Sequence, residues 1–211
     1  MRQFNLAFLF ESDKVCSTLR HSETTLGKAM SGPLIYVIEA PHTAEYFRDL
    51  LVSHFGGKVE VVLGYTASDL WHLMQTRGRP DAIIIQRKID YGPEILEVNP
   101  DIHFDDERTE HAGSRILRFV HECSVVLSAM FVVLLDGFDP VDFAGPIDRA
   151  TRFLREHGLL SVEYQKPFDS SDLIGRLCER FGLENPFPPL SEWAPEHSVS
   201  VGDDPEDESE G

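Results

Sequence analysis

Two kinds of hydrophobic pattern alternate along this chain, and this alternation limits most strongly how it can fold. Short apolar runs, which are typical of strands, alternate with longer stretches. In these stretches the apolar residues recur every three or four positions, which is typical of helices. The five runs cover residues 34–40, 58–64, 82–86, 129–135 and 159–164. The five helical stretches cover residues 42–55, 66–78, 114–127, 146–158 and 169–182. Because strands that are apolar along their whole length are buried on both faces, the pattern predicts an α/β fold: a doubly wound five-stranded parallel sheet with helices on both sides.

Polar residues at the start of the helical stretches predict where the helices begin. Thr66 or Ser68, Ser114, and Asp169 or Ser170 carry side-chain oxygens that can cap the first free backbone N–H groups. The stretch at 146–158 opens on a proline instead, which suits a first helical position because no hydrogen bond is lost there.

Composition divides the chain into three parts. Residues 1–32 lack a sustained period and are predicted to be a disordered N-terminal extension, in which Met30 is an alternative to the first methionine as the natural start. Residues 33–183 hold the predicted folded domain. Residues 184–211 are rich in proline and then in acids, a composition typical of a disordered tail.

The net charge of −17, from 36 acids and 19 bases, is concentrated in two segments. Residues 90–110 carry eight acids and one base, and residues 192–211 carry eight acids and no Lys or Arg. The first segment lies in a predicted acidic insertion, an extended loop at about 88–112 after the third strand. Nucleic acid is not an expected partner, because binding to a phosphate backbone needs a basic surface.

Neither membrane insertion nor secretion is expected. No apolar run reaches the roughly 18 residues of a membrane-spanning helix, and the apolar opening at residues 4–10 lacks the small-residue cleavage site of a secretory signal. The three cysteines, Cys16, Cys123 and Cys178, are far apart in the sequence and are predicted to be reduced thiols. We therefore expect a cytoplasmic protein.

The carboxyl ends of the predicted strands mark the candidate site, because open α/β sheets bind ligands at that edge. The residues at or next to these ends are Glu39, Gly64, Gln86, Asp136 and Lys166. The third strand is unusual, since its run of alanine and three isoleucines ends on an uncharged amide rather than on an acid.

Several of these strand ends resemble the receiver domain of two-component response regulators. The segment Tyr-Gln-Lys-Pro-Phe at 164–168 closes the fifth strand and precedes a capped helix. Pro80 and Asp81 introduce the third strand, and an acid followed by Pro41 ends the first. The resemblance covers about residues 33–182 and implies a flavodoxin-like receiver fold for the predicted domain.

Position by position, the resemblance implies a degenerate phosphoacceptor pocket, as in a pseudo-receiver. The family ends its first strand with two acids that hold Mg²⁺, where this chain has Ile38 and Glu39. The phosphoacceptor aspartate of the family is replaced by Gln86, and its hydroxyl residue on the fourth strand is replaced by a run ending in Asp136. The lysine of the fifth strand is kept as Lys166.

The replacement at Gln86 removes the chemistry that the family performs. A carboxylate can form an acyl phosphate while Mg²⁺ neutralises the developing charge, whereas an amide is a poor nucleophile with no ionisable oxygen. We therefore predict no phosphorylation at the usual position, no bound metal or cofactor, and no enzymatic activity. Lys166 is predicted to donate to Gln86 Oε1, with Glu39 or Asp136 as countercharge; alternatively, Lys166 only reaches solvent.

The resemblance implies a stand-alone, atypical response-regulator module in two-component or phosphorelay signalling that acts through protein contacts. A kinase, a regulator or another signalling protein is the expected partner, with a homodimer as a further arrangement. In the family, the fourth helix, fifth strand and fifth helix commonly contact partners, which corresponds here to about residues 147–178. Phe187 and Trp193 in the tail can form a short binding motif or pack back on the last helix.

Two alternatives stay open. The first is a phosphorylatable receiver whose acceptor has moved to Asp136 or Asp90. The second is a small metal-dependent α/β enzyme that uses the histidines and acids at 103–111, namely His103, Asp105, Asp106 and His111. A mobile acidic loop, acting as a lid or docking surface, fits that segment better because no regular ligand spacing is present.

Overall fold

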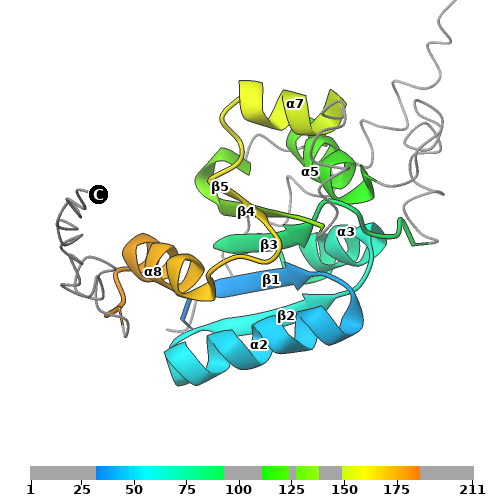
Figure 1. Cartoon of the computed structure of the whole chain (residues 1–211). Helices are drawn as coiled ribbons and strands as arrows, with labels where there is room; N and C mark the ends of the chain where they lie inside the picture. The colour runs from blue at the N-terminus through cyan, green and yellow to red at the C-terminus, as the bar shows by residue number, and fades with distance from the viewer. Residues whose placement is uncertain (1–31, 93–110, 124–126, 138–148, 186–211) are drawn as a thin grey trace, which may run out of the picture.

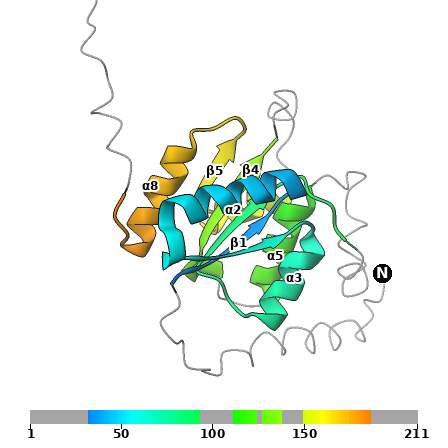
Figure 2. The same ribbon diagram turned by 90° about the horizontal axis from the view of Figure 1, so that it is seen from below.

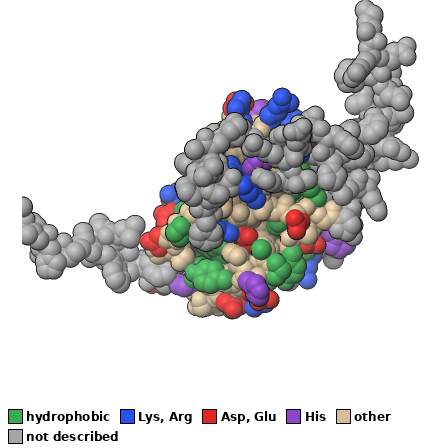
Figure 3. Space-filling view, turned by 45° about the vertical axis from the view of Figure 1, so that its right-hand side comes forward, with side chains coloured by type: hydrophobic (Ala, Val, Ile, Leu, Met, Phe, Trp, Pro, Cys, Tyr) green, Lys and Arg blue, Asp and Glu red, His purple; other side chains and the backbone are tan. Residues whose placement is uncertain are grey.

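The structure is a computed structural model that describes residues 32–92, 111–123, 127–137 and 149–185. The predicted N-terminal extension, most of the acidic insertion and the predicted tail, with Cys16, Phe187 and Trp193, lie outside these residues. The described part carries 14 Lys and Arg residues and 15 Asp and Glu residues, so its charges nearly balance. On the face shown in Figure 3, acidic, basic and apolar side chains are interspersed on the described surface.

Five parallel strands form one sheet, and the predicted fold class is confirmed (Figure 1). The strands are β1 (Leu34–Ile38), β2 (Glu60–Gly64), β3 (Ala82–Gln86), β4 (Phe131–Asp136) and β5 (Val162–Gln165). Their order across the sheet is β2-β1-β3-β4-β5. This order is that of the flavodoxin-like doubly wound folds, in which the strand order reverses next to β1.

Helices cover both faces of the sheet. They are α2 (Pro41–Phe55), α3 (Ala67–Thr76), α5 (Ala112–Cys123), α7 (Arg149–Glu156) and α8 (Ser170–Phe181). Helices α2 and α8 pack on one face and α3 and α5 on the other (Figure 2), while α7 lies against α5 (Figure 1). Each face has its own hydrophobic core, to which alternate residues of β1, β2, β3 and β4 contribute, whereas β5 contributes to the core beneath α2 and α8 alone.

The apolar run of β3 shows why the sequence folds this way. Every residue of β3 is buried, with Ile83 and Ile85 in the core beneath α3 and α5 and Ile84 in the core beneath α2 and α8. Strand β5 lies at the edge of the sheet, and its residues alternate between half-buried and exposed. Continuous apolar sequence thus belongs to a central strand, and mixed sequence to an edge strand.

Two of the predicted helix caps are confirmed and one is wrong. The Thr66 side chain accepts from Asp69 N at 3.1 Å in a reciprocal capping box, and Asp169 caps α8 by accepting from Ser171 N at 2.8 Å. Ser114 lies inside α5, which begins two residues earlier than predicted. Its hydroxyl is fully buried and forms a hydrogen bond of 2.6 Å with the Thr151 hydroxyl of α7 instead.

Both described cysteines, Cys123 and Cys178, are buried and reduced. Burial raises the pKa of the Cys178 thiol, and its Sγ lies 3.4 Å from the carbonyl oxygen of Glu184, to which it donates. Within the described part of the chain, no helix combines the length and apolar character that crossing a bilayer requires.

Candidate functional site

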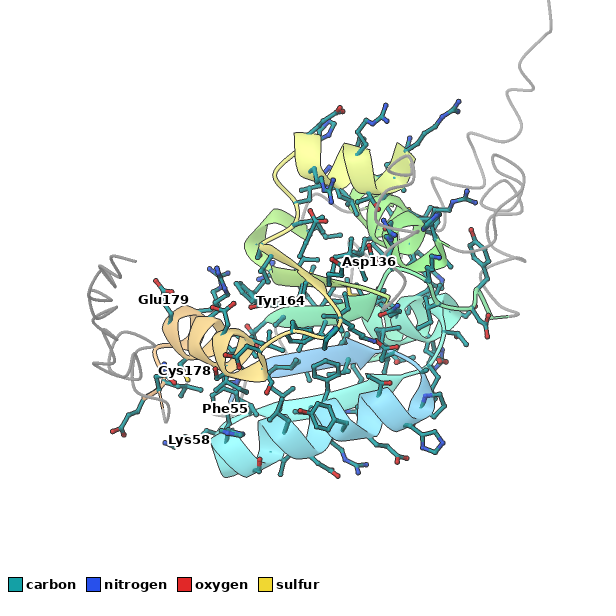
Figure 4. All side chains as sticks on the ribbon, viewed as in Figure 1. Phe55, Lys58, Asp136, Tyr164, Cys178 and Glu179 are labelled. Carbon is teal, nitrogen blue, oxygen red and sulfur yellow. The ribbon has the colours of Figure 1, made fainter. Side chains whose placement is uncertain are left out.

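The four predicted pocket residues lie at the carboxyl ends of neighbouring strands. Glu39 directly follows β1, Gln86 ends β3, Asp136 ends β4, and Lys166 directly follows β5. The parallel register aligns Gln86 with Leu135, and Asp136 with Gln165. Figure 4 shows Asp136 at the end of β4, on the edge of the sheet where ligands bind in this fold class.

Lys166 and Glu39 form a buried ion pair. Lys166 Nζ donates to Glu39 Oε2 at 2.6 Å, and the two side chains are 9% and 4% exposed. Glu39 Oε1 also accepts from Ala40 N at 3.0 Å, so both carboxylate oxygens have a donor. Glu39 therefore supplies the countercharge for Lys166, and the alternative in which Lys166 only reaches solvent is wrong.

Gln86 does not accept from Lys166, which contradicts the prediction for its side chain. The residue is buried, and its Oε1 has no hydrogen-bond partner among the described residues. Its Nε2 faces the end of β4, since a Cβ built on Gly137 would lie 4.0 Å from it. The charged oxygen of Glu39 is a stronger acceptor for an ammonium group than a neutral amide oxygen, which explains why Lys166 bonds to Glu39.

Arg87 is a site residue that the sequence analysis missed. One of its terminal nitrogens lies 2.8 Å from Asp136 Oδ1, and the side chains of Arg87 and Asp136 are 8% and 18% exposed. Asp136 Oδ1 also accepts from Gly137 N at 2.8 Å. A charged residue directly after a buried strand, in the sequence Ile-Ile-Ile-Gln-Arg, was the available indication that an acid lies opposite it.

The two ion pairs follow the period-two alternation of the strands. Val37 and Ile84 point into the core beneath α2 and α8. Glu39 and Gln86 come two residues later in their strands and therefore lie on the same face. Ile85 and Leu134 point into the core beneath α3 and α5, so Arg87 and Asp136, two residues later, lie on that face. The predicted pocket is therefore divided between the two faces of the sheet.

Helix α5 begins in direct contact with the end of β3. Gly113 N donates to Arg87 O at 3.1 Å, and a Cβ built on Gly113 would lie only 2.0 Å from Gln86 O. Since real Cβ atoms do not approach a carbonyl oxygen this closely, only glycine allows the contact. The close packing fixes the backbone of Gln86 and Arg87 relative to α5.

Aromatic packing holds the segment that carries Lys166. The rings of Tyr164 and Phe168 stack at 4.5 Å, and Phe168 stacks on Phe47 of α2 at 6.1 Å. The peptide bond between Lys166 and Pro167 is cis.

The Tyr164 hydroxyl joins β5 to α8. It donates to Asp172 Oδ2 at 2.5 Å, and Arg176 Nε donates to the same oxygen at 2.9 Å. Burial, and then this hydrogen bond, raise the pKa of Tyr164. Burial acts to raise the pKa of Asp172, but the donors Tyr164 and Arg176 outweigh it and lower the pKa below the ordinary value of 3.8.

The residues of the two alternative hypotheses are only partly described. Asp90 is exposed, and its carbonyl oxygen accepts from Ala67 N at 2.9 Å at the start of α3. His111 is buried directly before α5, while His103, Asp105 and Asp106 lie outside the described residues. No group of three potential metal ligands occurs within residues 32–92, 111–123, 127–137 and 149–185.

No protein-family model and no curated protein matches the sequence. Among solved structures, the chain is similar to the signal receiver domain of an HD domain-containing protein from Pseudomonas fluorescens Pf-5, with a TM-score of 0.48, 15% identity, and coverage of 72% of this chain and 95% of that chain. It is similar to a response regulator receiver protein from Burkholderia phymatum, with a TM-score of 0.45, 16% identity, and coverage of 74% and 99%. It is also similar to an adenylate cyclase from Rhodopirellula baltica, with a TM-score of 0.47, 11% identity, and coverage of 72% and 88%. The similar structures are mostly response regulator receiver domains.

Proposed function

We propose that this chain is a receiver-like signalling domain that works by contact with another protein and takes up no phosphate at the end of β3. The Lys-Pro-Phe segment after β5, the strand order, and a buried lysine at the carboxyl edge support the receiver-like part of the proposal. The residue at the end of β3 supports the second part, because the Gln86 amide cannot act as a nucleophile towards a phosphoryl group.

The proposal rests on the observation that both carboxylates near Gln86 are already paired with cations. Glu39 and Asp136 are each held by a buried cation of the same chain, at 2.6 Å from Lys166 and 2.8 Å from Arg87. A hard cation such as Mg²⁺ needs several oxygen ligands, and a carboxylate already neutralised by an ammonium or guanidinium group is a weak one. Phosphoryl transfer, which depends on charge neutralisation by a metal, is therefore unsupported at this edge.

The same ion pair limits the alternative in which Asp136 accepts phosphate. Arg87 and the Gly137 N–H both bind Asp136 Oδ1, and this pairing makes the whole carboxylate a weaker nucleophile towards a phosphoryl group. A reaction that broke the pair would leave the Arg87 charge buried and unpaired, which is costly. We therefore favour a domain held in one state over a receiver with a displaced acceptor.

Incubation with acetyl phosphate and Mg²⁺, followed by intact-mass measurement, tests the proposal. We expect no increase in mass, with an authentic receiver domain in the same buffer as the positive control. A Mg²⁺-dependent gain of one phosphate would contradict it. Asp136→Ala and Asp90→Ala variants would then identify the acceptor by loss of the gain.

We place the protein-binding face on α7, β5 and α8. These elements are tied to each other at the surface, since Arg155 pairs with Glu163 at 2.5 Å and Tyr164 bonds to Asp172. The expected partner is a kinase, a regulator or another signalling protein, or a second copy of the chain. Crosslinking in the native cell tests this face: Arg152→Glu on the exposed side of α7 should abolish the crosslinked product, whereas the control Arg79→Glu, exposed near the start of β3, should not.

A further inference from the structure

A cavity of about 370 Å³ lies between the ends of β4 and β5 and helix α7. Its lining includes Asp136, labelled in Figure 4, and Tyr164, whose ring itself packs on the other face of the sheet, against the core beneath α2 and α8. Its volume falls within the range of pockets that hold small molecules. The cavity lies beside the Arg87–Asp136 pair, and Glu39, Gln86 and Lys166 do not line it.

Charges of both signs line this cavity and cancel. Arg87 and Asp136 form the more buried pair, with side chains 8% and 18% exposed. Arg155 and Glu163 form the more open pair, in which Arg155 makes two parallel hydrogen bonds of 2.7 and 2.5 Å to the Glu163 carboxylate. Because two positive and two negative groups line the cavity, neither a simple anion nor a simple cation gains a net attraction there.

Arg87 retains an unused donor. Its Nε is buried and has no hydrogen-bond partner among the described residues, although its terminal nitrogen pairs with Asp136. A buried donor without an acceptor is destabilising, so an acceptor oxygen brought by a ligand would be favoured there. A guanidinium group binds carboxylates in particular through Nε and a terminal nitrogen together.

We propose that this cavity binds a small zwitterion, a free amino acid with an apolar side chain. Its carboxylate accepts from Arg87, its ammonium group donates to Glu163, and its side chain lies against Leu134. Such a ligand carries both charges, and each of them can lie next to a lining group of opposite charge, which a singly charged ligand cannot achieve. Because the site lies beneath the junction of α7 and β5, the bound amino acid would act on the protein-binding face; that role rests on the proposed function, whereas binding itself does not.

Titration of the ¹⁵N-labelled full chain with leucine, followed by amide chemical shifts, tests the proposal. We expect saturable shifts at millimolar leucine for Leu134, Asp136 and Glu163, with the distant strand β2 unchanged. N-acetyl-leucine lacks the ammonium group and leucine amide lacks the carboxylate. Each should bind at least about tenfold more weakly, since one charge-assisted hydrogen bond is lost.

Matched variants separate this site from binding elsewhere. Glu163→Gln should weaken the binding of leucine at least about tenfold. Glu60→Gln removes a comparable exposed ion pair, that with Arg77 at 2.8 Å, and should leave the affinity unchanged. The absence of saturable shifts with leucine and phenylalanine would overturn the proposal, as would equal shifts with acetate or inorganic phosphate, or an affinity unaffected by Glu163→Gln. None of these outcomes depends on whether the domain accepts phosphate.

Discussion

The two buried ion pairs at the sheet edge share the same chemistry but differ in their surroundings. The Lys166–Glu39 pair is closed, with both side chains at most 9% exposed and a donor on each carboxylate oxygen. The Arg87–Asp136 pair borders a cavity, Asp136 is 18% exposed, and Arg87 Nε lacks a partner among the described residues. The first pair is therefore enclosed by the protein, whereas the second lies where a ligand in the cavity could reach it.

Removing the lysine of the closed pair should have the largest effect. Lys166→Met leaves the Glu39 carboxylate buried without its cation, and we expect the free energy of unfolding to fall by about 3–5 kcal/mol. Urea unfolding measures this loss. Arg77→Met breaks an ion pair whose side chains are 52% and 48% exposed and should cost only about 0–1 kcal/mol.

The double variant Glu39→Leu/Lys166→Met sharpens this test. Because it removes both charges together, it should recover most of the stability lost in the single variant. If the single variant were no less stable than Arg77→Met, the Lys166–Glu39 contact would not be a buried one.

Removing the cation of the second pair should cost less. In Arg87→Met, Asp136 keeps the Gly137 N–H and gains access to water through the cavity, so we expect a loss of about 1–3 kcal/mol in urea unfolding. A loss as large as that of Lys166→Met would remove the distinction between the two pairs.

The Tyr164–Asp172 bond should make a smaller, pH-dependent contribution. Tyr164→Phe removes one hydrogen bond, and we expect a loss of about 1 kcal/mol near neutral pH. The pKa of Asp172 is lowered in the folded state, so its contribution is present above the ordinary value of 3.8 and is lost as the pH falls through the lowered pKa. The difference between the variant and the parent protein should therefore shrink in acid.

Urea midpoints measured from neutral pH down to the acid range check this dependence. Tyr46→Phe serves as the control, because Tyr46 is 56% exposed and should show no such trend. If the difference in stability between Tyr164→Phe and the parent protein grew in acid, the contribution assigned to the Tyr164–Asp172 hydrogen bond would be wrong.

The fold could be predicted from the sequence because its determinants are local. Continuous apolar runs such as that of β3 require burial on both faces, and Thr66 and Asp169 cap helices within a few residues of themselves. Ser114 shows the limit, since its partner Thr151 lies 37 residues away on another helix.

The site was less predictable because its contacts are not local in the sequence. The strand ends indicated which residues meet at one edge, but not which of them come close enough to pair. Glu39 and Gln86 lie on the same face, yet only Glu39 pairs with Lys166, and Arg87 was missed although it directly follows Gln86. Ion pairs between residues far apart in the sequence depend on the three-dimensional packing of both partners.

Gln86 should give the smallest effect, because it lies beside the closed pair without joining it. Its Oε1 makes no hydrogen bond to the described residues, so Gln86→Met loses no polar contact there and removes a buried unsatisfied acceptor. We expect the free energy of unfolding to stay the same or to rise by about 1 kcal/mol, since replacing an unsatisfied polar group by an apolar one of similar shape is neutral or stabilising. Gln75→Met, on the exposed side of α3, is the matched control and should change stability by less than about 0.5 kcal/mol. A clear loss of stability in Gln86→Met relative to Gln75→Met would mean that the amide holds the closed pair in place, and the difference between the two ion pairs would then have to include Gln86.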